Sequence, residues 1–448
     1  MTPDRVWDTL RPHVLVDDLG FVLDLEASRG SWLIDAREGT RYLDMFSFFA
    51  SSPLGMNHPA LSGDEQFRED LLRAAVNKPS NSDIATVELA SFVETFTRVL
   101  GDPALPHLFF VEGGALGVEN ALKAAFDWKS RRNEAAGRDP ALGTKVVHLR
   151  RAFHGRTGYT MSLTNTEPVK TDRYPKFDWP RIDVPAITFP LDEHRAEVEV
   201  AEARALDQAR AAFARHPHDI ACVLVEPIQG EGGDNHMRPE VLLALQALCV
   251  EHDALFALDE VQTGCGLTGS AWAYQQLGLE PDLVAFGKKL QVCGVMGGRR
   301  IDEVSDHVFT VSGRISSTWG GNLTDMVRAR RMLEVIEADG LIERAGVLGK
   351  ELVARLEELV AAHPGVLSNA RGRGLMCAVD LPDRDTRDVV VERLRTEEHV
   401  LVLPCGERSL RFRPTLAVTA DELAKACDAL EHVLSRPGTA GPHRVLTE

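Results

Sequence analysis

Short apolar segments alternate with amphipathic segments of helical length through the first two thirds of the chain. The segment 115–132 places Val118, Leu122 and Phe126 on one face, which is typical of an amphipathic helix. Alternation of short strands with helices indicates an α/β fold with a mainly parallel sheet flanked by helices. The predicted strands are 107–114, 145–149, 220–228, 254–261 and 282–289, and a second helix is predicted at 239–252.

The pattern changes after about residue 325. Two long helical segments at 325–340 and 341–363 precede short strands at 374–381 and 409–414, which is typical of a smaller α+β domain. The segment 197–216 is rich in Ala, Arg and Glu and predicts a solvated surface helix. We therefore expect an N-terminal segment that packs with the small domain, a large domain, and the small domain itself. These parts are predicted at 1–65, 66–325 and 326–448, with a flexible tail at 435–448.

Composition and charge favour a cytoplasmic protein that binds small molecules. The chain has 448 residues, enough for two or three domains of about 100–200 residues each. It carries 50 basic and 67 acidic residues and no basic block, which argues against nucleic-acid and anionic-membrane partners. Seven scattered cysteines without a C-x-x-C pair predict reduced thiols and no metal site. The sequence shows neither a secretory signal nor an apolar run of about 18 residues that would span a membrane.

A glycine pattern, G-x-G-x-x-G, occurs at Gly264, Gly266 and Gly269, shortly after the predicted strand 254–261. A dinucleotide-binding loop needs such glycines directly between a strand and a long helix. Here two residues intervene and no long helix follows, so we interpret the pattern as a weak signal.

Two charged residues at strand ends suggest different chemistry. Asp259 closes one predicted strand, and Lys288 follows it by 29 residues at the end of the next. Open α/β sheets bind ligands at the carboxyl ends of their strands. A partly desolvated lysine facing an aspartate suits Schiff-base chemistry on a cofactor with a cationic ring nitrogen. These two residues alone leave open the alternative of two unrelated surface charges.

Longer motifs carry a specific resemblance. The stretch "ALFALDEVQTGCGLTG…PDLVAFGKK" resembles the signature of class III aminotransferases, which depend on pyridoxal phosphate and have the fold of the type I superfamily. The resemblance covers nearly the whole chain, and "MFSFFASSPLGMNHP" and "NKPSNSD" are most similar to the family's lysine 6-aminotransferases. It implies a homodimer with shared active sites, pyridoxal 5'-phosphate as cofactor, and L-lysine and 2-oxoglutarate as substrates. Further matching motifs are "VEGGALGVENALKAA", "AFHGRTGY", "VEPIQGEGGDNH", "STWGGN" and "LRFRP".

The resemblance also implies which residues hold the cofactor. Lys288, rather than Lys289, would form the Schiff base, and Asp259 would keep the pyridine nitrogen protonated so that the ring accepts electrons. Gly114 and Ala115 would bind the phosphate, since a strand turns into a helix there and leaves N–H groups free. The other implied contacts are Phe153 stacked on the ring, Glu226, Gln262 near the ring's 3-oxygen, and Thr318 reaching the phosphate of the partner subunit.

The same resemblance assigns the substrate contacts. Arg156 would bind the carboxylate far from the reacting amine, and Arg411 the α-carboxylate of glutamate or 2-oxoglutarate, since arginine pairs carboxylates bidentately. An ω-amine donor has no carboxylate for Arg411, and Glu231 would then neutralise that arginine. Gln262 is expected beside both substrate and ring, and Arg413 is interpreted as structural.

One position departs from the lysine 6-aminotransferase pattern. Ser316 stands near the expected substrate site, where that branch leads us to expect Asn. The departure bears on the amine donor and leaves the reaction class unchanged. Within the family, 4-aminobutyrate and ornithine aminotransferases remain alternatives. Outside aminotransfer, an aminomutase would use the same lysine without needing Arg411, whereas a pyridoxal-phosphate-sensing regulator would need a DNA-binding domain for which the chain has no room.

Overall fold

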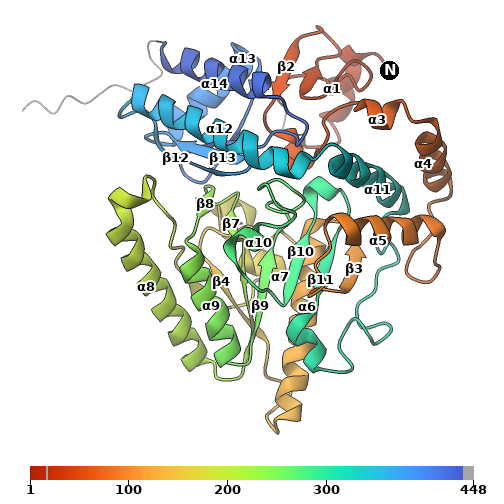
Figure 1. The fold of residues 1–448 in the computed structure, drawn as a ribbon, viewed down its shortest axis with the longest axis vertical. Coiled ribbons are helices and arrows are strands. Elements are labelled where there is room, and N and C mark those ends of the chain that lie inside the picture. Colours follow the sequence, from red (N-terminus) through yellow and green to blue (C-terminus); the bar gives the residue numbers. More distant parts are fainter. Residues whose placement is uncertain (17–18, 437–448) are drawn as a thin grey trace, which may run out of the picture.

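A seven-stranded sheet forms the centre of the computed structural model, which describes residues 1–16 and 19–436 (Figure 1). Strand β11 runs antiparallel to both of its neighbours, and the other strands are parallel to one another. The prediction of a mainly parallel α/β sheet is therefore confirmed. In spatial order the strands are β3 (His107–Val111), β11 (Cys293–Gly297), β10 (Leu283–Phe286), β9 (Leu255–Asp259), β6 (Ile220–Val225), β4 (Lys145–Leu149) and β5 (Arg181–Ile182).

Helices cover both faces of this sheet. Alternate residues of β6 enter different cores: Val223 and Val225 join the cluster that holds α9 (Pro239–Glu251), whereas Cys222 and Leu224 join the cluster that holds α6 (Gly114–Ala135). Successive side chains of a strand point to opposite faces, so a strand covered on both sides is apolar throughout. This explains why the strands read as continuous apolar runs.

The predicted surface helix is α8 (Leu191–Arg215), and it is less solvated than expected. Its inner face buries Val198, Ala205 and Phe213, and its carboxylate Glu202 is buried against Arg238, with a shortest N–O distance of 2.6 Å. Charged residues at regular spacing concealed this apolar stripe in the sequence.

The smaller C-terminal part lies above the central sheet in Figure 1. Helices α11 (Leu323–Ala338) and α12 (Leu341–Ala362) confirm the two predicted helices. They precede an antiparallel four-stranded sheet, which α12 packs against. The sheet has the order β12 (Ser368–Arg373), β13 (Met376–Asp380), β16 (Ser409–Phe412) and β15 (Leu403–Cys405), and the part is completed by α13 (Arg384–Thr396) and α14 (Ala420–Leu434).

The N-terminal segment joins this smaller part through backbone pairing. Strand β2 (Arg41–Asp44) lies antiparallel to β1 (Trp32–Ile34) and parallel to β14 (Val400–Leu401). The amide of Leu43 donates to His399 O at 2.8 Å. The domain boundaries at residues 65 and 325 stay predictions, and most of the predicted tail, 437–448, lies outside the described residues.

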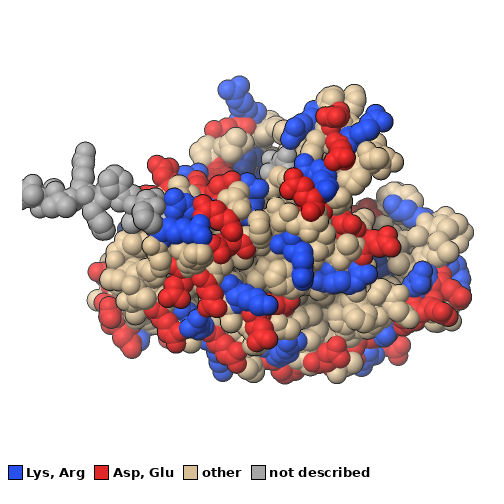
Figure 2. All heavy atoms as spheres, turned by 90° about the horizontal axis from the view of Figure 1, so that it is seen from above, with Lys and Arg blue, Asp and Glu red and all other residues tan. Residues whose placement is uncertain are grey.

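The remaining elements connect these parts, and α5 (Val87–Val99) and α4 (Glu65–Asn77) pack against α11. None of the helices within 1–16 and 19–436 is long and apolar enough to cross a membrane. On the face shown in Figure 2, acidic and basic side chains are intermixed. The short elements are η1 (Pro3–Arg5), α1 (Val6–Leu10), α2 (Ser47–Ala50), α3 (Pro59–Ser62), α7 (Gly158–Leu163), η2 (Pro168–Lys170), β7 (Ile228–Gln229), β8 (Asn235–His236), α10 (Ala273–Leu277), η3 (Lys288–Leu290) and η4 (Arg299–Glu303).

The glycine pattern after β9 serves packing. A Cβ at Gly264 would lie 2.5 Å from the ring of Trp272, and a Cβ at Gly269 would lie 2.7 Å from the Cα of Gly346 in α12. Residues 262–269 form turns and no helix. The glycines therefore allow this turn to pack closely against Trp272 and helix α12, and the structure agrees with the interpretation that they do not form a dinucleotide-binding loop.

We predict that Gly269→Ala destabilises the protein more than Gly365→Ala. Both glycines have positive φ, +86° and +81°, so both substitutions carry the cost of a left-handed alanine, about 1–2 kcal/mol. Only Gly269 faces backbone within 3 Å, which adds an overpacking cost of about 1–3 kcal/mol. Thermal denaturation should therefore give a melting temperature for Gly269→Ala about 1–3 °C below that of Gly365→Ala. Equal melting temperatures would show that α12 adjusts without cost.

Candidate active site

A cavity of about 450 Å³ lies at the carboxyl ends of β9 and β10, where an open α/β sheet binds its ligands. Strands β9 and β10 are parallel, with Ala285 opposite Asp259, so the residues that follow them meet at one edge of the sheet. The structure brings most of the predicted site residues together here. Those that line the cavity are Gly114, Ala115, Phe153, Arg156, Glu226, Glu231, Asp259, Gln262 and Lys288.

Lys288 has the properties of a nucleophilic amine. It is half-buried and follows Gly287 at the start of η3, directly after β10. Burial lowers the pKa of Lys288 to about 8, and the charges of Arg411 and Arg413 act in the same direction. A lysine must lose its proton before it can attack a carbonyl group, so this environment prepares it for Schiff-base chemistry near neutral pH.

Asp259 is fixed by a histidine that the sequence analysis did not assign. His154 Nδ1 lies 2.7 Å from Asp259 Oδ2, and the other carboxylate oxygen accepts from Val261 N at 3.0 Å. Burial alone would lower the pKa of His154, but the hydrogen bond and charge of Asp259 raise it. The hydrogen bond to His154 thus holds Asp259 in place where it lines the cavity. The only signal in the sequence was the position of His154 next to Phe153 in "AFHGR".

Glu226 organises the backbone around the cavity. Its two carboxylate oxygens accept from Phe153 N and Gly230 N, each at 3.0 Å. Burial raises the pKa of Glu226 to about 7. This carboxyl group thereby connects the end of β6 with the segment that carries Phe153 and with the loop that carries Glu231.

The N-terminus of α6 forms the anion-binding end of the cavity. Gly113 has a φ of +107°, and the helix begins at Gly114. A Cβ at Gly114 would lie 2.8 Å from Cγ1 of Val261, so only glycine allows the backbone to come this close. The first N–H groups of a helix have no partner within the helix and, together with the helix dipole, favour a phosphate.

Arg411 and Glu231 form a charge pair at one side of the cavity. Arg411 Nη2 donates to Glu231 Oε2 at 2.6 Å, and the arginine is buried. Its Nε and Nη1 atoms have no hydrogen-bond partner among the residues that the structure describes. Burial would raise the pKa of Glu231, but the charges of Arg411 and Lys170 lower it to about 2. Arg411 is thus neutralised and still offers donors to a further acceptor.

The neighbouring arginine, Arg413, is already fully engaged. It forms an ion pair with the buried Asp234 and donates from Nε to Gln262 Oε1 at 3.1 Å. This geometry supports its interpretation as a structural residue, which also orients Gln262 toward the cavity.

Arg156 is available to a ligand. It is exposed, its guanidinium lies 5.8 Å from the ring centroid of Phe153, and no ion pair to it occurs within the described ranges. A free guanidinium at the cavity wall suits a carboxylate at the far end of an extended substrate.

Three predicted residues do not line the cavity. Arg411 is buried and paired with the lining residue Glu231, whereas Ser316 and Thr318 lie elsewhere. Ser316 and Thr318 are exposed in the loop between η4 and α11, and neither lines the cavity of the single chain. The backbone oxygen of Thr318 accepts from Ser80 Oγ at 2.5 Å, which fixes part of this loop.

Comparisons with known proteins agree with this geometry. The sequence profile of the aminotransferase class-III family matches residues 16–434. The chain is 64% identical to the L-lysine-epsilon aminotransferase of Mycobacterium tuberculosis over 97% of this chain and 96% of that protein, and 62% identical to the enzyme of the same name from Amycolatopsis lactamdurans over the same shares. The solved structure of a lysine aminotransferase from M. tuberculosis, in the internal aldimine form, superimposes with a TM-score of 0.95 at 64% identity and covers 96% of this chain and 99% of that one.

We predict that Lys288 reacts selectively with amine reagents in protein stripped of small molecules. With a pKa of about 8, Lys288 should reach half of its maximal rate of reductive methylation near pH 8, and the exposed Lys123 serves as the comparison. Lys289 should be protected, because it is fully buried and donates to Pro414 O at 3.1 Å. Peptide mass spectrometry distinguishes the three sites. Preferential labelling of Lys289, or a Lys288 profile that follows Lys123, would contradict the assignment.

Proposed function

The chain belongs to the aminotransferase class-III family, and on this basis we propose that it is an L-lysine 6-aminotransferase that uses pyridoxal 5'-phosphate. It would transfer the ε-amino group of L-lysine to 2-oxoglutarate. The products would be glutamate and 2-aminoadipate 6-semialdehyde, which cyclises. Identities of 62–64% to proteins named L-lysine-epsilon aminotransferase support the choice of donor. The observation that carries the proposal is that Glu231 masks Arg411, whereas Arg156 at the cavity has no ion pair among the described residues.

The cavity fits pyridoxal phosphate in its donor set and in its backbone shape. The N-terminus of α6 at Gly114 and Ala115 would hold the phosphate, Asp259 would hold the protonated ring nitrogen, and Phe153 and Glu226 would lie beside the ring. Lys288 Nζ would be the covalent attachment point. The bound cofactor supplies an electron sink that stabilises negative charge on the reacting carbon of the substrate.

The chain's own residues supply proton transfer and electrostatic control. Lys288, once released from the cofactor, would move a proton on Nζ between the two reacting carbons, and a pKa of about 8 suits both directions near neutral pH. Asp259, held by His154, would keep the proton on the ring nitrogen. Gln262, oriented by Arg413, would contact the substrate side of the ring.

Two substrates must use the same pocket in turn. Lysine presents its ε-amine to the reacting end, where it has no carboxylate, so Glu231 would keep Arg411 neutralised. 2-Oxoglutarate has a carboxylate at that end, so Glu231 would move away and Arg411 would bind the carboxylate through two donors. Arg156 would bind the distal carboxylate of both. An aminomutase would not need this second arginine.

A homodimer with shared active sites is part of the proposal. Thr318 would complete the phosphate site of the partner subunit, which agrees with its exposed position outside its own cavity. Ser316 would approach the partner's substrate from the same loop.

We predict that mixed dimers regain activity. Lys288→Ala removes the attachment point, and Thr318→Asp places a negative charge against the phosphate, so each homodimer should be inactive. A heterodimer combines an intact Lys288 from one chain with an intact Thr318 from the other in one of its two sites. After subunit exchange, verified by mass spectrometry, the mixture should regain a substantial part of the wild-type activity. Proven exchange without any recovery would contradict the shared site.

We predict that L-lysine is preferred over ornithine and 4-aminobutyrate. All three offer Arg156 a carboxylate, and Glu231 must mask Arg411 for each of them, so the discrimination depends on cavity length and on groups that receive the α-ammonium of lysine. A site built for that ammonium loses about 1–3 kcal/mol with 4-aminobutyrate, or roughly tenfold or more in kcat/KM. The measurement is kcat/KM for each donor with 2-oxoglutarate, with the cyclic product identified. If 4-aminobutyrate or ornithine is preferred, lysine is the wrong donor, and Ser316 becomes the first residue to examine.

A further inference from the structure

The carboxylate of Glu231 is shared between two cations. Its Oε2 accepts from Arg411 Nη2 at 2.6 Å, and its Oε1 accepts from Lys170 Nζ, also at 2.6 Å. We propose that Lys170 is the second partner that holds Glu231 when it leaves Arg411. Lys170 would then be a positioning residue that sets the balance between ω-amine donors and the 2-oxo acid. This inference rests on the proposed function, because it concerns how the same site alternates between its two substrates.

A second partner matters because Glu231 is only partly hydrated: its side chain is 28% exposed. A carboxylate that left Arg411 without another partner would lose a charge-assisted hydrogen bond in this partly desolvated position. Lys170 removes most of this cost, since one charge-assisted hydrogen bond of Glu231 persists during the movement. The charges of Arg411 and Lys170 and their hydrogen bonds to the carboxylate also hold the pKa of Glu231 far below its usual range.

Lys170 is held in place independently of Glu231. Its side chain is 11% exposed, and its Nζ lies 3.3 Å from Glu167 Oε2 and 5.6 Å from the ring centroid of Phe153. It closes the short η2 helix (Pro168–Lys170), which fixes its backbone. The ammonium group would therefore stay where it is while Glu231 moves.

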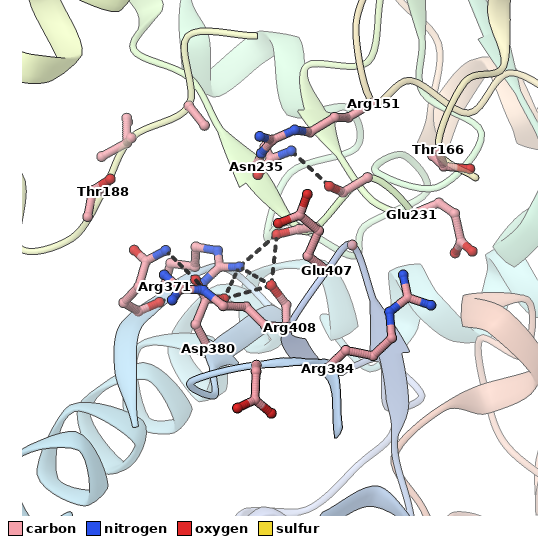
Figure 3. A pocket seen from close by; sticks show the side chains of 18 of the residues that line it. Arg151, Thr166, Thr188, Glu231, Asn235, Arg371, Asp380, Arg384, Glu407 and Arg408 are labelled. Atoms are coloured by element: carbon pink, nitrogen blue, oxygen red, sulfur yellow. Dashed lines mark hydrogen bonds and ion pairs between the residues drawn. The ribbon is translucent and has the colours of Figure 1, made fainter. Parts of the chain in front are cut away.

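The structure provides room for this movement. Glu231 lines the 450 Å³ cavity and also a second cavity of about 690 Å³ on its other side. Thr166 and Glu167, close to Lys170 in the chain, line the second cavity as well. Figure 3 shows Glu231 and Thr166 on one side of this cavity and Arg371 and Asp380 on the other. The second cavity therefore offers the carboxylate a space into which it would turn when it leaves Arg411.

The loop backbone is anchored, so the movement is confined to the side chain. Glu231 O accepts from Gly406 N at 2.9 Å, and Arg371 donates to the carbonyl oxygens of Gly233 and Asp234 at 2.6 and 2.8 Å. A Cβ at Gly232 would lie 2.0 Å from Arg151 O, so this loop is also closely packed. Rotation of one glutamate between two fixed cations is therefore the simplest switch that this geometry allows.

Lys170 would draw Glu231 away from Arg411, whereas Glu231 masks Arg411, so the loss of Lys170 and the loss of the Glu231 charge should have opposite consequences. Without Lys170, Glu231 should stay on Arg411, which keeps the ω-amine half-reaction and hinders the 2-oxo acid. Without the charge of Glu231, Arg411 should stay unmasked, which hinders the ω-amine and keeps the 2-oxo acid. In either case, the loss of one charge-assisted hydrogen bond should weaken the affected half-reaction by about tenfold.

The test uses the holoenzyme and follows each half-reaction separately by the visible spectrum of the cofactor under single-turnover conditions. Lys170→Met should raise the concentration of 2-oxoglutarate for half-maximal rate by about tenfold, while the lysine half-reaction changes by no more than about twofold. Glu231→Gln should show the reverse pattern. Lys170→Arg keeps the charge and should restore the affinity for 2-oxoglutarate. Lys176→Met, at an exposed lysine of the same segment, is the matched control and should leave both half-reactions unchanged.

A double variant separates this role from direct substrate binding. In a Glu231→Gln background, Lys170→Met should add no further loss with 2-oxoglutarate, because the carboxylate that Lys170 positions is gone. An undiminished tenfold loss there would mean that Lys170 binds the substrate itself and would overturn the proposal. Equal losses in both half-reactions of Lys170→Met would do the same. If lysine does not serve as a donor at all, the proposed function is wrong. The role of Lys170 is then tested by the same two half-reactions, with 4-aminobutyrate or ornithine as the ω-amine.

Discussion

A buried guanidinium that must always be neutralised constrains the whole site. Arg411 lies on β16, in register with Ala378 of β13, and reaches from the small sheet to Glu231 in a loop of the large one. An unpaired charge at this depth costs several kcal/mol, so either Glu231 or a substrate carboxylate must meet it. The two sheets therefore have to keep a fixed distance, which the close glycine contact between Gly269 and α12 helps to maintain.

Parallel strands bring Asp259 and Lys288 together at the carboxyl edge of the large sheet. Because the carboxyl ends of β9 and β10 lie side by side, Asp259 and Lys288 reach the same cavity although they are far apart in sequence. Helices on both faces exclude water, which lowers the pKa of Lys288 and strengthens the bond between His154 and Asp259. The same burial that stabilises the sheet thus prepares the amine and fixes its counterpart.

Local sequence signals recovered the strands, the long helices and the residues at strand ends, because these depend on apolar periodicity and on one edge of one sheet. The roles of Arg156, Arg411 and Glu231 came from the family resemblance. In the structure Arg156 and Glu231 line one cavity, and Arg411 is paired with Glu231. The sequence signals did not reveal the roles of His154 and Lys170, because their partners, Asp259 and Glu231, are more than 60 residues away in the chain. The buried apolar face of α8 was also not predicted, because charged residues interrupt its periodicity in the sequence. Ser316 and Thr318 cannot be placed against a substrate from one chain, since their proposed site belongs to a second copy.

Specificity for the donor must therefore arise at the distal end. In the proposed function, the pair of Arg411 and Glu231 would distinguish an amine from a 2-oxo acid, yet it would treat every ω-amine alike, since none presents a carboxylate there. Arg156 would likewise accept any carboxylate of suitable reach. The donors would then be distinguished by the length of the cavity and by the polar groups that receive an α-ammonium. Ser316 of the partner subunit would be one of these groups. A serine side chain is shorter than an asparagine side chain, so a water molecule would have to bridge the gap between the hydroxyl and the α-ammonium of lysine. Such a water preserves most of the strength of a hydrogen bond at a small entropic cost. The departure at this position is thus compatible with lysine as the donor, provided that the distal end of the site is hydrated.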